Sequence, residues 1–236
     1  MGISGLNKYF KQHASPKSIQ HLYLDTLKHK TIVFDTSIYI YKFLETGKLL
    51  ESMYTLIGQC VEYDITPLFV FDGKPLESKQ NVLDARNRRK IKASKNYVEL
   101  KNHYDNVSET ISEQEKQYLL KKMTNYKKRC IRVSHNNIIK LKEIMDAMGV
   151  YYCDAPNESD VVCAYYVKKG FAWACVSDDM DLFAYGCPYV IRNWDILTKS
   201  FYLYDFSRIK QDIGVPDKYM KNVLLLLGND YISRKE

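Results

Sequence analysis

Three short apolar runs in this sequence each end in acidic residues. The runs TIVF, PLFVF and FAWACV occupy residues 31–34, 67–71 and 171–176, and they are followed by Asp35, by Asp72, and by Asp179 and Asp181. Runs of this length, rich in β-branched and aromatic residues, are typical of buried strands. Because ligands of open parallel sheets bind beyond the carboxyl ends of the strands, we expect these carboxylates to gather at one edge of a sheet.

Helical stretches lie between the strand-like runs. Residues 136–148 carry apolar side chains at helical spacing, and Asn157 is a plausible N-cap for a helix running to about Lys169. That helix would hold Glu158 and Asp160 in its first turn, where negative charge also simply offsets the helix dipole. In a chain of 236 residues with 46% hydrophobic residues, this alternation predicts one α/β domain, with a mostly parallel central sheet flanked by helices.

Acidic residues recur at the ends of the expected elements. A last helix should start at Pro216 and end at Gly228, just before Asp230. The full acidic set is Asp35, Asp72, Glu158, Asp160, Asp179, Asp181 and Asp230. Any one of these residues alone is more often a cap or turn residue, but packed like charges are costly unless cations bind among them. The set predicts a site for two Mg²⁺ ions, with Mn²⁺ able to substitute, of the kind that hydrolyses phosphodiesters.

A polar, basic stretch with a helical pattern separates the second and third strand-like runs. Residues 86–132 hold 14 lysines and arginines against five acidic residues, so the rest of a chain with net charge +7 is slightly acidic. The basic residues that would suit a phosphate backbone are Lys79, Arg86, Arg88, Arg89 and Lys90. A solvated pair of charged helices is the alternative, although such faces usually mix both signs. We expect a basic helical insertion over the acidic edge of the sheet.

Other classes of site find little support in the sequence. The six cysteines form no C-x-x-C pair, the histidines have no H-x-x-H spacing, and no G-x-S-x-G elbow is present. These observations argue against a zinc site and against a nucleophilic serine. No apolar stretch is long enough for a signal peptide or a membrane span. We expect no membrane partner and an intracellular protein.

Six segments, in the same order, resemble those of the flap endonuclease family of 5' nucleases, which includes XPG-like and exonuclease-one-like branches. The opening MGISGL is similar to MGI-x-GL, and FDTSIYIYKF and VFDGKPLESK resemble the first and second aspartate segments of the family. APNESDVVCAYY resembles AP-x-EAEA-x-CA, VSDDMDLFAYG resembles TEDMD-x-L-x-FG, and LLLLGNDY resembles LLG-x-DY. The likeness runs from Met1 to about Tyr231.

The resemblance implies a PIN-like nuclease core in which the seven acidic residues hold the metal ions. It also implies that Lys79 and Arg86 reach the scissile phosphate, that a base stacks on Tyr41, and that Gly2 lies near the active site. One departure is Asp160, which is a methylene shorter than the glutamate of the family segment.

The resemblance further implies how one nuclease domain of residues 1–236 is divided. Residues 1–78 would form the N-terminal part of the core, 79–132 a helical gateway or cap, and 133–236 the internal part. The implied substrate is DNA with a 5' flap, nick, gap or 5' end, in replication, repair or recombination. The implied location is the nucleus or a viral or cytoplasmic site of DNA replication. Cleavage of RNA, and a scaffold that binds nucleic acid without turnover, remain open. No helix-two-turn-helix or sliding-clamp peptide is visible, so we expect either cleavage positions that scatter over several nucleotides or a partner protein that supplies a second anchor on the duplex.

Overall fold

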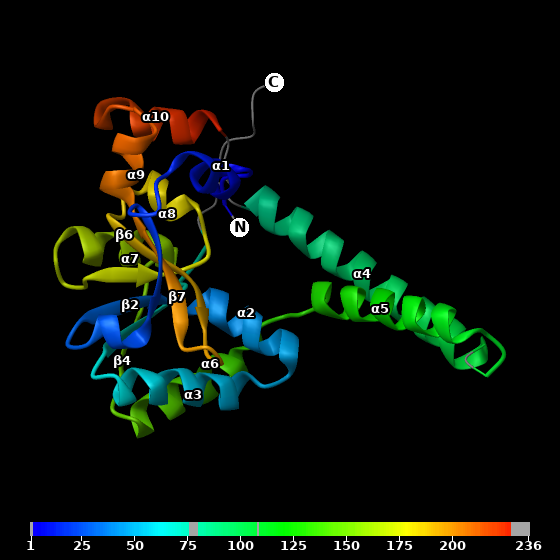
Figure 1. Ribbon diagram of the computed structural model, residues 1–236. Coiled ribbons are helices and arrows are strands. Elements are labelled where there is room, and N and C mark those ends of the chain that lie inside the picture. Colours follow the sequence, from blue (N-terminus) through cyan, green and yellow to red (C-terminus); the bar gives the residue numbers. More distant parts are fainter. Residues whose placement is uncertain (1, 76–79, 108, 228–236) are drawn as a thin grey trace.

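The computed structural model describes residues 2–75, 80–107 and 109–227. Within them lies a seven-stranded sheet in the order β1-β7-β6-β5-β2-β3-β4 (Figure 1). The strands are β1 (Ile19–Tyr23), β2 (Thr31–Asp35), β3 (Thr66–Phe71), β4 (Tyr151–Asp154), β5 (Ala174–Val176), β6 (Tyr189–Asp195) and β7 (Ser200–Asp205). The five strands from β6 to β4 pair in parallel, whereas β7 pairs antiparallel with both β6 and β1. The predicted fold class, an α/β fold with a mostly parallel sheet, is confirmed.

Helices cover both faces of the sheet. One face carries α2 (Thr36–Thr46), α3 (Leu49–Glu62) and α6 (His135–Ala147), and the other carries α1 (Leu6–His13), α7 (Ser159–Lys168), α8 (Asp181–Ala184), α9 (Phe206–Asp212) and α10 (Asp217–Leu226). A 3-10 helix, η1 (Leu24–Leu27), connects β1 to β2. Successive side chains of a strand point to opposite faces, so Phe34 of β2 packs in one core cluster and Val33 in the other. Burial on both faces explains the unbroken apolar runs.

The third predicted strand is shorter than its apolar run. Only Ala174–Val176 form β5, because the amides of Phe171 and Ala172 donate hydrogen bonds to Tyr166 O at the end of α7. Phe171 is 61% exposed. This apolar residue therefore lies in the turn after α7, and the prediction of a strand at 171–173 is wrong.

The helix expected after Asn157 begins one residue later than predicted. Asn157 O accepts a hydrogen bond from Gly73 N, which holds this residue against the loop after β3. Glu158 is the N-cap of α7 in its place, and Asp160 lies in the first turn. The helix predicted at 136–148 is confirmed as α6, with a capping box at Ser134.

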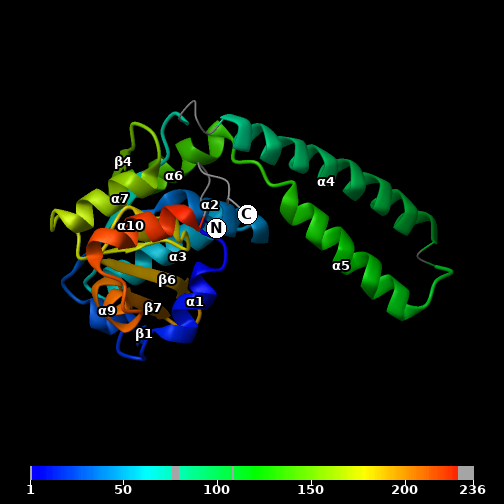
Figure 2. The same cartoon turned by 90° about the horizontal axis from the view of Figure 1, so that it is seen from above.

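The basic stretch forms a helical hairpin of α4 (Gln80–Val107) and α5 (Glu113–Arg129), which pack antiparallel and project from the core (Figure 1, Figure 2). Ala93 is a buried residue of α4, and α5 buries none. The insertion is helical, as predicted, but most of its length extends away from the sheet instead of lying over its edge. Within the described ranges, no helix is both long and apolar enough to cross a membrane.

Candidate metal centre and nucleic-acid interface

Five of the predicted metal-binding carboxylates come from neighbouring elements at one edge of the sheet. Asp35 is the last residue of β2, Asp72 follows β3, Asp179 and Asp181 follow β5, and Asp160 lies in the first turn of α7. The strands β5, β2 and β3 are adjacent and parallel, so their carboxyl ends meet at the same edge. The structure thus brings these residues to the place that the sequence pattern predicted.

Two carboxyl groups of this cluster are enclosed and interact directly. Burial, followed by the charge of Asp72, raises the pKa of Asp35 from 3.8 to about 6. Burial also raises the pKa of Asp160 well above its ordinary value, and the charges of Asp35 and Asp179 raise it further. Each ionised carboxylate therefore makes the next one harder to ionise.

The donor atoms of the cluster fit hard divalent cations. Asp160 Oδ1 is buried and has no hydrogen-bond partner within the described part of the chain, which leaves a carboxylate oxygen open to a ligand. Carboxylate oxygens are the donors that Mg²⁺ and Mn²⁺ prefer. In the ranges that the structure covers, no three acidic, histidine or cysteine side chains already converge in metal-binding geometry. A bound cation would offset the repulsion between these carboxylates and so allow them to approach one another.

Glu158, the N-cap of α7, lies close enough to the phenol of Tyr185 to affect its ionisation. Burial raises the pKa of Tyr185, and the negative charges of Glu158, Asp160 and Asp181 raise it further. The pKa of this phenol is thus raised by acidic residues from both α7 and the segment after β5. Glu158 therefore belongs to the neighbourhood in which the sequence placed it.

Three serines that were not among the predicted site residues hold the carboxylates. Ser177 Oγ donates a hydrogen bond to Asp35 Oδ2 at 3.0 Å, and Ser37 Oγ donates one to Asp72 Oδ2 at 2.5 Å. The hydroxyl of Ser159 contacts both carboxylates. Each serine lies within two residues of a predicted ligand in the sequence. A search for hydroxyl residues beside the predicted ligands would therefore have identified all three.

The segment after β5 is fixed by local hydrogen bonds. Asp179 N donates to Ser177 Oγ at 3.1 Å, and Asp181 N donates to Asp179 Oδ1 at 3.0 Å. Gly2 lies against this segment with a φ of 73°, and a Cβ at Gly2 would overlap a carboxylate oxygen of Asp179 and another of Asp181. Only glycine fits so close an approach, and Gly2 thus lies beside the cluster, as the resemblance implied.

Asp178 differs from its acidic neighbours because it faces β6. Its Oδ1 accepts a hydrogen bond from Asn193 N at 2.9 Å, and its carbonyl oxygen accepts one from Arg192 Nη2 at 2.8 Å. Asp178 therefore anchors the segment after β5 to the neighbouring strand.

The fold concentrates basic charge where the hairpin joins the core. Residues 86–92 and 127–132 hold nine lysines and arginines and no acidic residue, whereas residues 94–126 hold five of each sign. Because α4 and α5 are antiparallel, both basic runs lie at the end nearest the core (Figure 2). We call residues 86–92 and 127–132 the hairpin base. It includes Arg86, Arg88, Arg89 and Lys90, whereas two other predicted site residues, Lys79 and Asp230, lie outside the described residues.

The hairpin base contacts α2, the helix that Asp35 caps. Lys90 Nζ lies 4.9 Å from the centroid of the Tyr41 ring, and Lys128 Nζ lies 2.6 Å from Glu45 Oε1. Tyr41 is 41% exposed. An exposed aromatic ring, a basic surface and the carboxylate cluster are therefore arranged along one helix.

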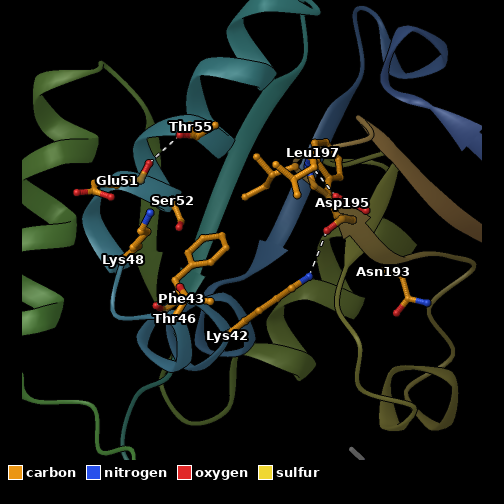
Figure 3. A pocket seen from close by; sticks show the side chains of 12 residues that line it. Lys42, Phe43, Thr46, Lys48, Glu51, Ser52, Thr55, Asn193, Asp195 and Leu197 are labelled. Carbon is orange, nitrogen blue, oxygen red and sulfur yellow. Dashed lines mark hydrogen bonds between the residues drawn. The ribbon is translucent and has the colours of Figure 1, made fainter. Parts of the chain in front are cut away.

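A separate hollow of about 790 Å³ lies between the α2–α3 region and the turn after β6 (Figure 3). Its lining includes Lys42, Lys48, Glu51 and Leu197, and Lys42 Nζ donates to Trp194 O at 3.3 Å. The hollow adjoins the C-terminal half of α2, whereas Asp35 lies at the N-terminal end of that helix. None of the predicted site residues that the structure describes lines it.

The raised pKa of Asp35 makes the stability of the metal-free protein depend on pH. The folded-state pKa of Asp35, about 6, exceeds the ordinary value of 3.8. The contribution of protonated Asp35 to the free energy of unfolding is therefore fully present below about pH 4 and is lost as pH rises through 6. The shift corresponds to a loss on the order of 3 kcal/mol. We expect the Tm of the metal-free chain to fall between pH 5 and pH 7.5, and Mg²⁺ to restore it at pH 7.5. In Asp35→Asn the fall should be smaller, and an identical pH profile would contradict the expectation.

Comparison with known proteins identifies two matching family models and related proteins along most of the chain. The XPG N-terminal domain matches residues 1–93, and the XPG I-region matches residues 149–230. The flap endonuclease 1 of Methanococcus aeolicus is 30% identical over 228 residues, which cover 90% of this chain and 66% of the relative. The flap endonuclease 1 of Homo sapiens is 29% identical over 249 residues, covering 98% of this chain and 62% of the relative. The chain thus spans just under two thirds of the length of these relatives.

Solved structures share the fold. The catalytic core of Rad2 in complex with DNA substrate has a TM-score of 0.70 at 22% identity, covering 98% of this chain and 64% of that one. Human GEN1 in complex with Holliday junction DNA has a TM-score of 0.67 at 20% identity, covering 98% of this chain and 51% of that one. The two matched domains and the relatives of similar sequence show that the chain belongs to the XPG-like flap endonuclease family.

Proposed function

We propose that this chain is a divalent-metal-dependent, structure-specific 5' nuclease that hydrolyses phosphodiester bonds in DNA. The observation that carries the proposal is the carboxylate cluster, in which burial and neighbouring charges raise the pKa of Asp35 and Asp160. Enclosing like charges is costly unless cations bind among them. A protein that only bound nucleic acid would gain nothing from this cost.

The residues proposed to hold two Mg²⁺ ions, for which Mn²⁺ can substitute, are Asp35, Asp72, Glu158, Asp160, Asp179, Asp181 and Asp230. When bound, the ions would supply an activated water and neutralise charge on the phosphate. The serines that contact Asp35 and Asp72 orient these ligands. Gly2 leaves room beside Asp179 and Asp181, because a side chain there would fill that space.

The hairpin base and Tyr41 would bind the nucleic acid. Arg88 and Arg89 are exposed on α4, where they can contact phosphates. Each such contact releases condensed counterions, and this release favours binding. Tyr41 offers a ring on which a base can stack, an interaction worth about 1–3 kcal/mol. A strand that lies along the exposed surface of the hairpin base and α2 would reach Asp35 at the start of the same helix.

The related proteins support branched or interrupted DNA as the substrate class. They are named flap endonucleases, and the solved relatives include a Rad2 core with a DNA substrate and GEN1 with Holliday junction DNA. We propose DNA with a 5' flap, nick, gap or 5' end as the substrate, and an intracellular role in DNA replication, repair or recombination.

A cleavage assay on end-labelled substrates tests the proposal. Flap, nicked, gapped and single-stranded DNA, and RNA of the same sequences, are incubated with the chain in Mg²⁺, Mn²⁺ or EDTA. We expect cleavage of the flap or nicked DNA that EDTA abolishes and added Mg²⁺ restores. Faster cleavage of RNA would instead identify an RNA-directed enzyme. Binding without cleavage in either metal would identify a scaffold.

A further inference from the structure

One serine contacts two carboxylates that come from neighbouring strands. Ser159 is the first residue of α7 and is 2% exposed. Its Oγ lies 2.9 Å from Asp35 Oδ1 and 2.8 Å from Asp72 Oδ1, and its backbone N–H donates to Asp72 Oδ1 at 2.9 Å. The other oxygens of these carboxylates accept hydrogen bonds from Ser177 and Ser37. Three hydroxyls thus orient the pair, and only that of Ser159 touches both members.

The two contacts of the Ser159 hydroxyl cannot both be donated hydrogen bonds. A hydroxyl carries one proton, so it donates a hydrogen bond to only one of the two carboxylates at a time. The backbone N–H has no such choice, because the start of α7 fixes its direction toward Asp72. Ser159 therefore holds Asp72 through the main chain and keeps its hydroxyl available to Asp35. This arrangement opposes the tendency of two like charges to turn apart.

From this geometry we infer that Ser159 is a positioning residue of the proposed metal centre, which ties Asp35 and Asp72 to the start of α7 and so limits how far the two ligands can turn apart. The inference rests on the proposed function and adds a residue to it. Ser159 acts through the two carboxylates and does not itself bind the ion. Loss of a group that orients a metal ligand typically weakens metal binding about 10- to 100-fold. Since Ser159→Ala keeps the backbone N–H, we expect the lower end of this range.

The test is direct Mn²⁺ binding to the full chain without nucleic acid, measured from the electron paramagnetic resonance signal of free Mn²⁺. Ser159→Ala should raise the Kd roughly tenfold, and Ser159→Thr, which retains a hydroxyl, should stay within about threefold of the parent. Thr36→Val is the matched control. The hydroxyl of Thr36 is buried beside Asp35 but has no hydrogen-bond partner among the residues that the structure places, so its removal should leave the Kd unchanged.

An unchanged Kd in Ser159→Ala, or an equal rise in Thr36→Val, would overturn the inference. Should Ser159→Ala not fold, Ser159→Cys replaces it with the same expected rise, because a thiol is a weak donor. The outcomes separate the inference from the proposed function. A parent chain that binds Mn²⁺ and weakens in Ser159→Ala but cuts no DNA overturns only the function. A parent that cuts DNA while Ser159→Ala binds Mn²⁺ normally overturns only the inference.

Discussion

Asp179→Asn and Asp181→Asn should each reduce cleavage by about 10³-fold or more, which is roughly 4 kcal/mol of transition-state stabilisation. Each substitution removes one negative charge from the carboxylate cluster and leaves the size of the side chain unchanged. The amide oxygen of Asn can still accept the hydrogen bond that Asp181 N donates to Asp179 Oδ1, so the segment after β5 should keep its shape. Neither residue belongs to the hairpin base, so affinity for DNA should change by less than about threefold.

Asp178→Asn is the matched control for these two variants. It removes the same charge from the same segment, but Asp178 faces Asn193 N and Arg192, and an amide oxygen can still accept from Asn193 N. Cleavage by Asp178→Asn should remain within about threefold of the parent. The measurements are single-turnover rates on a 5' flap and equilibrium binding in Ca²⁺. Rates near the parental value for both Asp179→Asn and Asp181→Asn would remove them from the metal centre.

Arg86→Met should lower the single-turnover rate by about 100-fold, on the order of 3 kcal/mol, as when one donor to a developing oxyanion is lost. Arg86 is half-buried near the start of α4, at the end of the hairpin nearest the core. Affinity should fall much less, because several other basic residues of the hairpin base remain. The resemblance of the segment around Lys79 to its family counterpart leads us to expect the same for Lys79→Met.

Lys101→Met provides the comparison for Arg86→Met. Lys101 is an exposed residue of the same helix, but it lies in the stretch of the hairpin where the two signs of charge balance. Its loss should change neither the rate nor the salt dependence of binding measurably. A drop in affinity as large as the drop in rate for Arg86→Met would make Arg86 an ordinary phosphate contact, with a salt slope lowered by about one.

The fold class and the position of the acidic edge were predictable because they depend on local patterns. The runs ending at Asp35 and Asp72 are apolar throughout, as strands covered on both faces must be. A carboxylate directly after such a strand can lie only at the edge where the strand ends. The shortened third strand was not predictable, because Phe171 is apolar yet pairs its amide with the end of α7. Composition alone does not distinguish these two uses of an aromatic residue.

The sequence by itself therefore determined the α/β class, the strands that end at Asp35 and Asp72, and the edge at which their carboxylates lie, because strand and helix periodicities are visible within short windows. It did not reveal β1, β4, β6 or β7 or the order of the strands. Only the tertiary structure decided how these groups are held. The hydroxyl of Ser159 spans Asp35 and Asp72 across 124 and 87 residues of chain, and the two basic runs of the hairpin meet only because α4 and α5 fold back on each other. Contacts of this kind depend on the packing of distant segments, which no local pattern encodes.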